Sequence, residues 1–357
     1  MNPSGSNESS SHLTRREAIA TLAAGAVVAA TGPFIHADDK TGGKRPIVGT
    51  GEHTYECIHE WCQPPESVRW LNTHGVAVDS EGLIYIKHQS GGPTPMDTIV
   101  VYDPSGKIVR SFGKEYHQGG HGIDIRNDGG EEFLYLSDVH NRQAVKTTKT
   151  GEVVWSRKYP QEANVYKNEN GYRPTNIAFN PDGSFYVADG YGSNYIHHYD
   201  KDAKWLKTWG GTGKEPGKMQ TPHGIWLDNR PGREPALIIA DRANARLQYF
   251  DLEGKFLSII EGVLYPAHFD IRGDVLLVPD LHARVSLFDK DNNVIVHLGD
   301  DEAWRKEVLN GFKVRADPSR WKPGKFIHPH DACFDADGNI FVVEWVDAGR
   351  ITKLRKV

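Results

Sequence analysis

The sequence contains few cysteines and no strongly basic block. Its three cysteines, Cys57, Cys62 and Cys333, exclude a disulfide-stapled scaffold, because at most Cys57 and Cys62 could close a local bridge. The net charge of −5 and the lack of a Lys/Arg-rich run argue against nucleic acid, since neutralising phosphates usually requires a clustered basic face. We therefore expect a globular protein without a nucleic-acid partner.

A long hydrophobic run is also missing. The longest apolar stretch, residues 18–30, is too short and too rich in Ala and Gly to span a bilayer comfortably. It follows Arg15 and Arg16, and Ala37 offers a small residue for cleavage, a combination typical of a twin-arginine export signal. The alternative is that the stretch forms an amphipathic first helix of the domain.

The export signal predicts three segments: a signal peptide over residues 1–37, a linker over 38–52 and a folded domain over 53–357. We expect an exported protein, periplasmic or extracellular, with no stable membrane anchor after cleavage.

A repeat organises the rest of the chain. Six similar segments, among them "HGVAVDSEGLIYI", "TNIAFNPDGSFYVAD" and "HDACFDADGNIFVVE", start at His74, His121, Thr175, His223, Ala267 and His330. Each has a short apolar strand, a turn built on Asp, Asn or Gly, and a second apolar strand, followed by further alternating strands such as "TIVVYDP" and "KIVRSFG". Four strands per repeat are typical of a propeller blade. We predict an all-β fold, a six-bladed β-propeller.

The last repeat is one strand short. It ends at "RITKLRKV", while "TYECIHEWC" precedes the first repeat as an unattached outer strand. We predict that this N-terminal strand completes the last blade and closes the ring, which removes the open sheet edges. Residues 160–173 and 301–326 do not fit the repeat, and we expect long loops or a short helix there, either as lids or as solvated decoration.

One repeat position is rich in histidine. The first strand of each blade lines the channel of a propeller, so equivalent residues converge on the axis. That position holds His74, His121, Thr175, His223, Ala267 and His330. A single histidine would be explained by a structural hydrogen bond, but four predict a shared metal, because imidazole is the commonest protein metal ligand. Nitrogen ligands without a thiolate cluster suit zinc, iron, copper or nickel.

Polar residues also end the second strands. They are Lys87 and His88, Asp138, Asp189, Asp241, Asp280 and Glu344. The acids can brace the neighbouring turns by accepting backbone N–H bonds. Tyr191 and Arg242 follow two of these acids, and we predict that they lie at the mouth of the channel. There a tyrosine can exchange protons, and an arginine can hold a carboxylate with two hydrogen bonds.

Several motifs carry a family resemblance. "HGIDI", "ADGYGSNYI", "TPHGIWL", "ADRANARLQYF" and "PHDACFDADGNIF" resemble the peptidyl-α-hydroxyglycine α-amidating lyases, six-bladed propellers related to NHL-repeat proteins. That family cleaves a peptidyl-α-hydroxyglycine into a peptide amide and glyoxylate, with zinc on the axis and calcium deeper in the channel. The resemblance implies a lyase acting on a small α-hydroxylated or peptidyl substrate, with zinc or another transition metal on the axis and calcium as a second ion.

The resemblance also implies roles for individual residues. The implied zinc ligands are His121, His223 and His330. The implied calcium ligands are the Asp331 carboxylate and the main-chain carbonyls of Val76 and Ile123. Tyr191 would take the hydroxyl proton and Arg242 would lie in the substrate mouth. Three protein ligands leave a metal position open for the substrate hydroxyl, whose pKa the metal lowers.

The chain departs from the family pattern at three places. Lys87 and His88 stand where the family has an arginine, and His328 stands where it has a methionine. His74 adds an axial imidazole that the family lacks. We therefore include His88 and His328 among the candidate catalytic residues and His74 among the candidate metal ligands.

Two other functions stay open. A non-catalytic NHL-type propeller would bind a protein or glycan partner through its loops. A lactonase-like hydrolase would more naturally hold calcium with Glu, Asn and Asp at the axis, so the four histidines favour the lyase-like enzyme over it.

Overall fold

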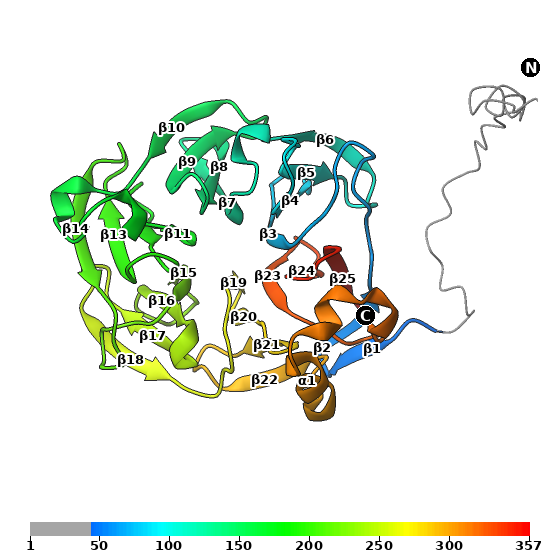
Figure 1. The fold of residues 1–357 in the computed structure, drawn as a ribbon. Coiled ribbons are helices and arrows are strands. Elements are labelled where there is room, and N and C mark those ends of the chain that lie inside the picture. Colours follow the sequence, from blue (N-terminus) through cyan, green and yellow to red (C-terminus); the bar gives the residue numbers. More distant parts are fainter. Residues whose placement is uncertain (1–43) are drawn as a thin grey trace, which may run out of the picture. The chain divides into compact units, whose positions relative to one another are not determined.

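The computed structural model describes residues 44–357, which form a ring of six antiparallel sheets (Figure 1). The predicted signal peptide lies outside the described residues. Each sheet has four or five strands and radiates from a central axis, so the predicted all-β, six-bladed propeller is confirmed. None of the helices in residues 44–357 is long and apolar enough to cross a membrane.

The first three blades each contain four strands. Blade 1 comprises β3 (Thr73–Val78), β4 (Ile84–His88), β5 (Ile99–Tyr102) and β6 (Ile108–Phe112). Blade 2 comprises β7 (Gly120–Asp128), β8 (Glu131–Asp138), β9 (Gln143–Thr148) and β10 (Val153–Arg157). Blade 3 comprises β11 (Asn176–Phe179), β12 (Phe185–Ala188), β13 (Tyr195–Tyr199) and β14 (Trp205–Gly210).

The last three blades continue the pattern. Blade 4 comprises β15 (Pro222–Asp228), β16 (Ala236–Asp241), β17 (Arg246–Phe250) and β18 (Phe256–Ile260). Blade 5 comprises β19 (Asp270–Arg272), β20 (Val275–Asp280), β21 (Arg284–Phe288) and β22 (Val294–Leu298). Blade 6 has the strand order β23 (Pro329–Phe334), β24 (Ile340–Glu344), β25 (Arg350–Lys356), β2 (His53–Ile58) and β1 (Ile47–Thr50).

The ring is closed by the N-terminal strand, as predicted. β2 pairs antiparallel with β25, with Cys57 opposite Leu354, so the first and last strands of the domain share one sheet. β1 adds a fifth strand to this blade through its pairing with β2. β1 lies within residues 38–52, where we expected a linker, so this part of the segment is sheet.

Burial explains why the inner strands read as continuous apolar runs. β4 and β16 are buried along their whole length, because a neighbouring blade covers each face of the sheet. The apolar side chains of adjacent blades form six separate cores; the one between blades 1 and 2, for example, contains Tyr85, Ile99 and Leu136. Outer strands such as β10 expose Val153 and Val154.

Aspartates build the turns of the repeat. In six turns an Asp side chain accepts hydrogen bonds from the backbone N–H groups two and four residues later: Asp79, Asp103, Asp200, Asp251, Asp289 and Asp335. This side-chain mimic of a backbone turn fixes the reversal between strands. The acids that end the second strands brace loops as expected; Asp280, for instance, accepts from the amides of Leu264 and Tyr265.

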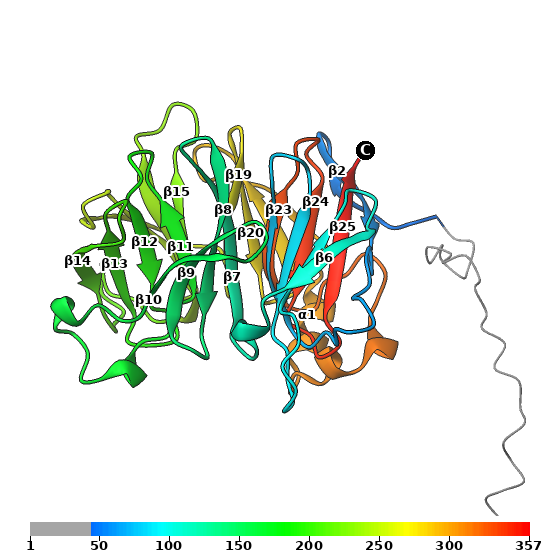
Figure 2. The ribbon, with the colours of Figure 1, turned by 90° about the horizontal axis from the view of Figure 1, so that it is seen from above.

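The two insertions form short helices. Residues 160–173 contain η3 (Gln161–Ala163) and η4 (Glu169–Gly171). Residues 301–326 contain α1 (Glu302–Leu309), η6 (Lys313–Ala316) and η7 (Pro318–Arg320). Figure 2 shows α1 at one end of the ring. It is the end at which the inner strands begin, because Arg315 contacts Asn72, which precedes β3, and Asp347, which follows β24.

Candidate functional site

Four histidine rings meet at the start of the inner strands. They come from blades 1, 2, 4 and 6 as His74, His121, His223 and His330, and all are buried. Their ring centroids are 4.4 Å apart for His74–His330, 4.6 Å for His121–His223, 4.7 Å for His223–His330, 4.9 Å for His121–His330 and 5.3 Å for His74–His121. The repeat therefore brings together residues up to 256 positions apart.

Backbone carbonyls orient three of these rings. Nδ1 of His121 lies 2.7 Å from the carbonyl oxygen of Thr175, and Nδ1 of His223 lies 2.7 Å from that of Ala267. Nδ1 of His330 lies 2.8 Å from the carbonyl oxygen of His74. In each case the acceptor is the axial residue of the next blade. A carbonyl can only accept, so Nδ1 carries the proton and Nε2 presents its lone pair, as in metal-bound histidines.

Glycine after the histidine makes this contact possible. A Cβ on Gly122 would lie 2.6 Å from the Thr175 carbonyl oxygen, and one on Gly224 would lie 2.6 Å from that of Ala267. Gly75 is similarly placed, 2.8 Å from the carbonyl oxygen of His121. The His-Gly pairs of blades 1, 2 and 4 are therefore explained by the close approach of the neighbouring blade, which a Cβ would prevent there. In blade 6, Asp331 follows His330, and the contact with the His74 carbonyl forms without a glycine.

Three of the four axial rings have a nitrogen that is free to bind a ligand. Nε2 of His121, Nε2 of His330 and both ring nitrogens of His74 are buried without a hydrogen-bond partner. One nitrogen from each of these three rings lies within 4.8 Å of the others. Burial lowers the pKa of His74 to about 3 and holds those of His121 and His330 well below the usual range, so the rings are neutral at pH 7. Converging neutral imidazoles fit a transition metal.

Tyr191 and Arg242 stand beside this layer. The Tyr191 hydroxyl lies 3.0 Å from Nε2 of His223, and Nη1 of Arg242 donates to the same hydroxyl at 3.1 Å. Because the guanidinium can only donate, the tyrosine donates its proton to His223. The Tyr191 side chain is 41% exposed, so its ring faces the open end of the channel.

Arg242 is a buried cation without a carboxylate. Nε donates to the Pro266 carbonyl at 3.2 Å, whereas Nη2 is buried without a partner. No ion pair to Arg242 occurs within residues 44–357, and burial lowers its pKa. An unpaired buried guanidinium is costly, and an anionic ligand would relieve that cost.

His88 and Lys87 each lie against a backbone carbonyl. Nε2 of His88 lies 2.9 Å from the Asp97 carbonyl oxygen, and the ring packs edge-on against Trp70. Nζ of Lys87 donates to the Ser137 carbonyl at 2.7 Å, and burial lowers its pKa to about 8. Among the ring contacts of the described residues, none joins His88 to an axial histidine.

His328 lies under the 301–326 insertion. Its Nδ1 lies 2.7 Å from the Leu281 carbonyl oxygen, and its Nε2 is buried without a partner. Phe312 and Trp345 flank the ring at centroid distances of 5.3 and 5.6 Å. Phe312 has a φ of 56°, a strained conformation for an aromatic residue, and is 47% exposed. Phe312 from the insertion and Trp345 after β24 thus pack around His328.

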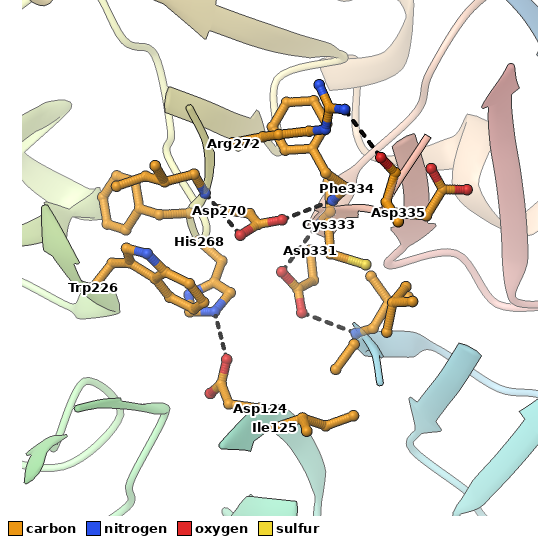
Figure 3. A pocket seen from close by; sticks show the side chains of 17 residues that line it. Asp124, Ile125, Trp226, His268, Asp270, Arg272, Asp331, Cys333, Phe334 and Asp335 are labelled. Atoms are coloured by element: carbon orange, nitrogen blue, oxygen red, sulfur yellow. Dashed lines mark hydrogen bonds and ion pairs between the residues drawn. The ribbon is translucent and has the colours of Figure 1, made fainter. Parts of the chain in front are cut away.

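A second polar layer lies below the histidines, in a cavity of about 370 Å³ (Figure 3). Asp331 accepts hydrogen bonds from the amides of Val76 and Ala332, at 2.9 and 2.8 Å. His268 lies 3.4 Å from Asp124, whose Oδ2 has no partner. Burial raises the pKa of Asp331 to about 7.

Sequence reasoning identified Asp331 but missed three neighbours, Asp124, His268 and Asp270. They occupy the first and third positions after the axial residue in their strands, so the same repeat alignment could have found them. Such an oxygen-rich layer fits a hard cation such as calcium, and Val76 and Ile123 lie in the adjacent strands β3 and β7. Within residues 44–357, only the axial histidines bring three side-chain ligand atoms within 4.8 Å, so a calcium here would need main-chain oxygens as well.

Curated relatives include amidating enzymes. No protein-family profile matches the chain. Peptidyl-glycine alpha-amidating monooxygenase of Mus musculus is 27% identical over 299 residues, which are 75% of this chain and 29% of that protein. Peptidyl-alpha-hydroxyglycine alpha-amidating lyase 1 of Drosophila melanogaster is 26% identical over 348 residues, 84% of this chain and 60% of that protein. NHL repeat-containing protein 3 of Mus musculus is 29% identical over 197 residues, covering 52% and 54%.

Solved structures agree on the fold. The XC5397 gluconolactonase of Xanthomonas campestris has a TM-score of 0.56 at 10% identity and covers 90% of this chain and 93% of its own. A protein of unknown function from Bacteroides thetaiotaomicron has a TM-score of 0.56 at 12% identity, covering 81% and 71%. At these identities the likeness concerns the fold alone. The chain is therefore a six-bladed β-propeller that is similar to peptidyl-α-hydroxyglycine amidating lyases and to an NHL-repeat protein.

Proposed function

We propose that this protein is an exported, metal-dependent lyase that cleaves small α-hydroxylated carboxylates of the peptidyl-α-hydroxyglycine type. The observation that carries the proposal is the Tyr191 hydroxyl, held between Arg242 and His223 at the edge of the axial imidazoles. The similarity to amidating lyases over 84% of the chain supports it.

The axial histidines are the proposed metal ligands. His121, His223 and His330 each use Nδ1 on a backbone carbonyl and keep the Nε2 lone pair for a ligand; that of His223 accepts from the Tyr191 hydroxyl, a bond that a metal would replace. A divalent metal bound there supplies a Lewis acid that lowers the pKa of a substrate hydroxyl. Because the rings are neutral at pH 7, no proton has to leave them before the metal binds.

Tyr191 is the candidate base. In the cleavage, the hydroxyl loses a proton, the bond between Cα and the amide nitrogen breaks, and that nitrogen gains a proton; the products are an amide and glyoxylate. When a metal occupies Nε2 of His223, the Tyr191 proton would be released to solvent, which reaches this 41% exposed residue. The tyrosine oxygen can then take the hydroxyl proton and pass it to the leaving nitrogen, and the Arg242 donor stabilises negative charge on that oxygen.

Arg242 is the candidate carboxylate-binding residue. Its unpartnered Nη2 offers the donor that a substrate carboxylate needs, and its burial strengthens that interaction. His88 and His328 remain proposed contributors to the mouth. His328 is the better placed of the two, because its Nε2 is free, whereas Nε2 of His88 lies against the Asp97 carbonyl.

Export and partners are part of the proposal. The twin arginine at Arg15 and Arg16 and the apolar run after it support transport by the twin-arginine route to the periplasm or beyond. The twin-arginine route exports proteins that are already folded, which would allow the metal to be inserted before export. The partner is a small-molecule or peptide substrate rather than nucleic acid.

The test is release of glyoxylate from a peptide ending in α-hydroxyglycine, with the same peptide ending in glycine as control. The metal-loaded protein should release glyoxylate from the first peptide only, and a chelator should abolish the release. A metal-loaded, folded protein that leaves both peptides intact contradicts the lyase assignment and favours a non-catalytic propeller.

A further inference from the structure

We propose that His74 is a fourth metal ligand, so that four imidazoles hold a metal that takes five or six ligands. This inference rests on the proposed metal-dependent function. It concerns the residue that departs from the family pattern, and it changes the class of metal expected at the axis.

His74 has no other hydrogen-bonding role for its side chain. Both ring nitrogens are buried and have no hydrogen-bond partner, and the residue is only 6% exposed. The other three axial rings each have Nδ1 against a carbonyl. A polar ring left unsatisfied in the interior costs free energy, because its nitrogens have lost water without gaining another hydrogen-bond partner. A ligand on the axis would remove part of that cost.

The ring also lies where a ligand must lie. His74 packs 4.4 Å from His330 and 5.3 Å from His121, and a nitrogen from each of the three is within 4.8 Å of the others. His223 lies 4.7 and 4.6 Å from the same two rings, and its Nε2 accepts from the Tyr191 hydroxyl. His74 and His223 are thus both neighbours of the His121–His330 pair, and His74 is the one whose nitrogen lies within 4.8 Å of theirs.

The four rings are not evenly spaced. His121 and His330 each contact all the other axial rings, whereas no ring contact joins His74 to His223 in the described part of the chain. His74 and His223 thus flank the central pair from opposite sides. Four imidazoles in this arrangement would suit a metal that takes more than four ligands better than a tetrahedral one.

The number of ligands narrows the choice of metal. Zinc in proteins is almost always four-coordinate in a site filled by protein ligands, so four imidazoles would close it to substrate. Iron(II), cobalt(II), nickel(II) or manganese(II) accept more ligands and would keep open positions. Two such positions could take both the hydroxyl and the carboxylate oxygen of an α-hydroxy acid, beside Tyr191 and Arg242.

The experiment compares cobalt(II) binding by the wild-type protein, His74→Ala and His74→Asn. Visible absorption reports coordination number, because four-coordinate cobalt(II) absorbs much more strongly than five- or six-coordinate cobalt(II). Titration gives the dissociation constant. His198→Ala is the matched control, since His198 is also buried with a free Nε2 but its ring contacts only Tyr186 among the ring pairs of the described residues.

We expect weak bands for the wild type and the control. In both His74 variants the affinity should fall about 100-fold, comparable to or greater than the loss of an outer-shell partner, and in His74→Ala the bands should intensify. An intense wild-type spectrum, or unchanged affinity and spectrum in folded His74 variants, overturns the four-imidazole site but leaves the proposed function standing. A wild-type protein that binds no metal overturns both.

Discussion

The Tyr191 hydroxyl lies 3.0 Å from Nε2 of His223, the ring nitrogen that the Ala267 carbonyl leaves free. This contact joins the mouth of the propeller to its histidine layer, and Arg242 donates to the same hydroxyl. One hydroxyl is thus placed between a cation and a candidate metal ligand.

Replacing Tyr191 with phenylalanine should separate chemistry from metal binding. Tyr191→Phe removes the hydroxyl but keeps the ring that packs 5.0 Å from His121. We expect kcat for glyoxylate release to fall by roughly 10²–10⁴, the usual contribution of a general base, with metal content unchanged. Unchanged kcat would exclude Tyr191 as the base, and lost metal would make its role structural.

Arg242→Lys tests carboxylate recognition. Lysine keeps the positive charge but loses the planar fork, one arm of which holds Tyr191 while Nη2 stays free. We expect kcat/KM to fall about 10- to 100-fold, since hydrogen bonds to charged groups are worth about 1.5–3 kcal/mol. The loss should be much smaller for a substrate whose carboxylate is replaced by an amide. Equal losses for both substrates would contradict a carboxylate-binding role.

Gly122→Ala should disturb the position of His121 in the histidine layer. The added Cβ would lie 2.6 Å from the Thr175 carbonyl oxygen, which holds Nδ1 of His121. We expect a loss of about 1–3 kcal/mol in unfolding free energy, as for an overpacked core, and weaker metal binding.

The control for this substitution is Gly232→Ala, which meets no atom within 4 Å but has a φ of 81°. It should cost about 1 kcal/mol for backbone strain alone and leave metal affinity unchanged. If Gly122→Ala behaved like this control, the close approach of blades would not be what orients His121.

Asp331 should make the metal-free protein less stable as the pH rises. Burial raises its pKa from 3.8 to about 7, so the folded protein keeps a proton that the unfolded chain has released. The stability from this group is therefore present below pH 4 and lost between pH 4 and 7. Asparagine does not titrate. In the presence of chelator, the unfolding free energy of the wild type should therefore fall relative to that of Asp331→Asn as the pH rises from 4 to 7. A difference that is independent of pH would contradict the raised pKa.

The repeat made the ring and its histidine layer predictable. Equivalent positions in a propeller converge, so one alignment of His74, His121, His223 and His330 predicted contacts between distant segments. The missing strand of the last repeat likewise predicted the pairing of β2 with β25. β1 was not predicted, because "IVGT" is short and contains Gly49, whose φ is 92°.

Side-chain directions were less predictable. Asp124, His268 and Asp270 lie on inner strands whose alternation the sequence shows, but only the packing of blades 2, 5 and 6 brings them around one cavity. His88 ends β4, and its Nε2 lies against the Asp97 carbonyl, a contact that its place at a strand end does not predict. Strand registers follow from sequence patterns, whereas these contacts depend on the loops between the strands.

Elemental analysis of the purified protein beside a His121→Ala, His223→Ala double variant measures whether the axial histidines hold a metal. We expect close to one transition-metal ion per wild-type chain and its loss from the folded double variant. Absence of metal from the wild type, or retention of the same metal by the double variant, would contradict an axial metal centre.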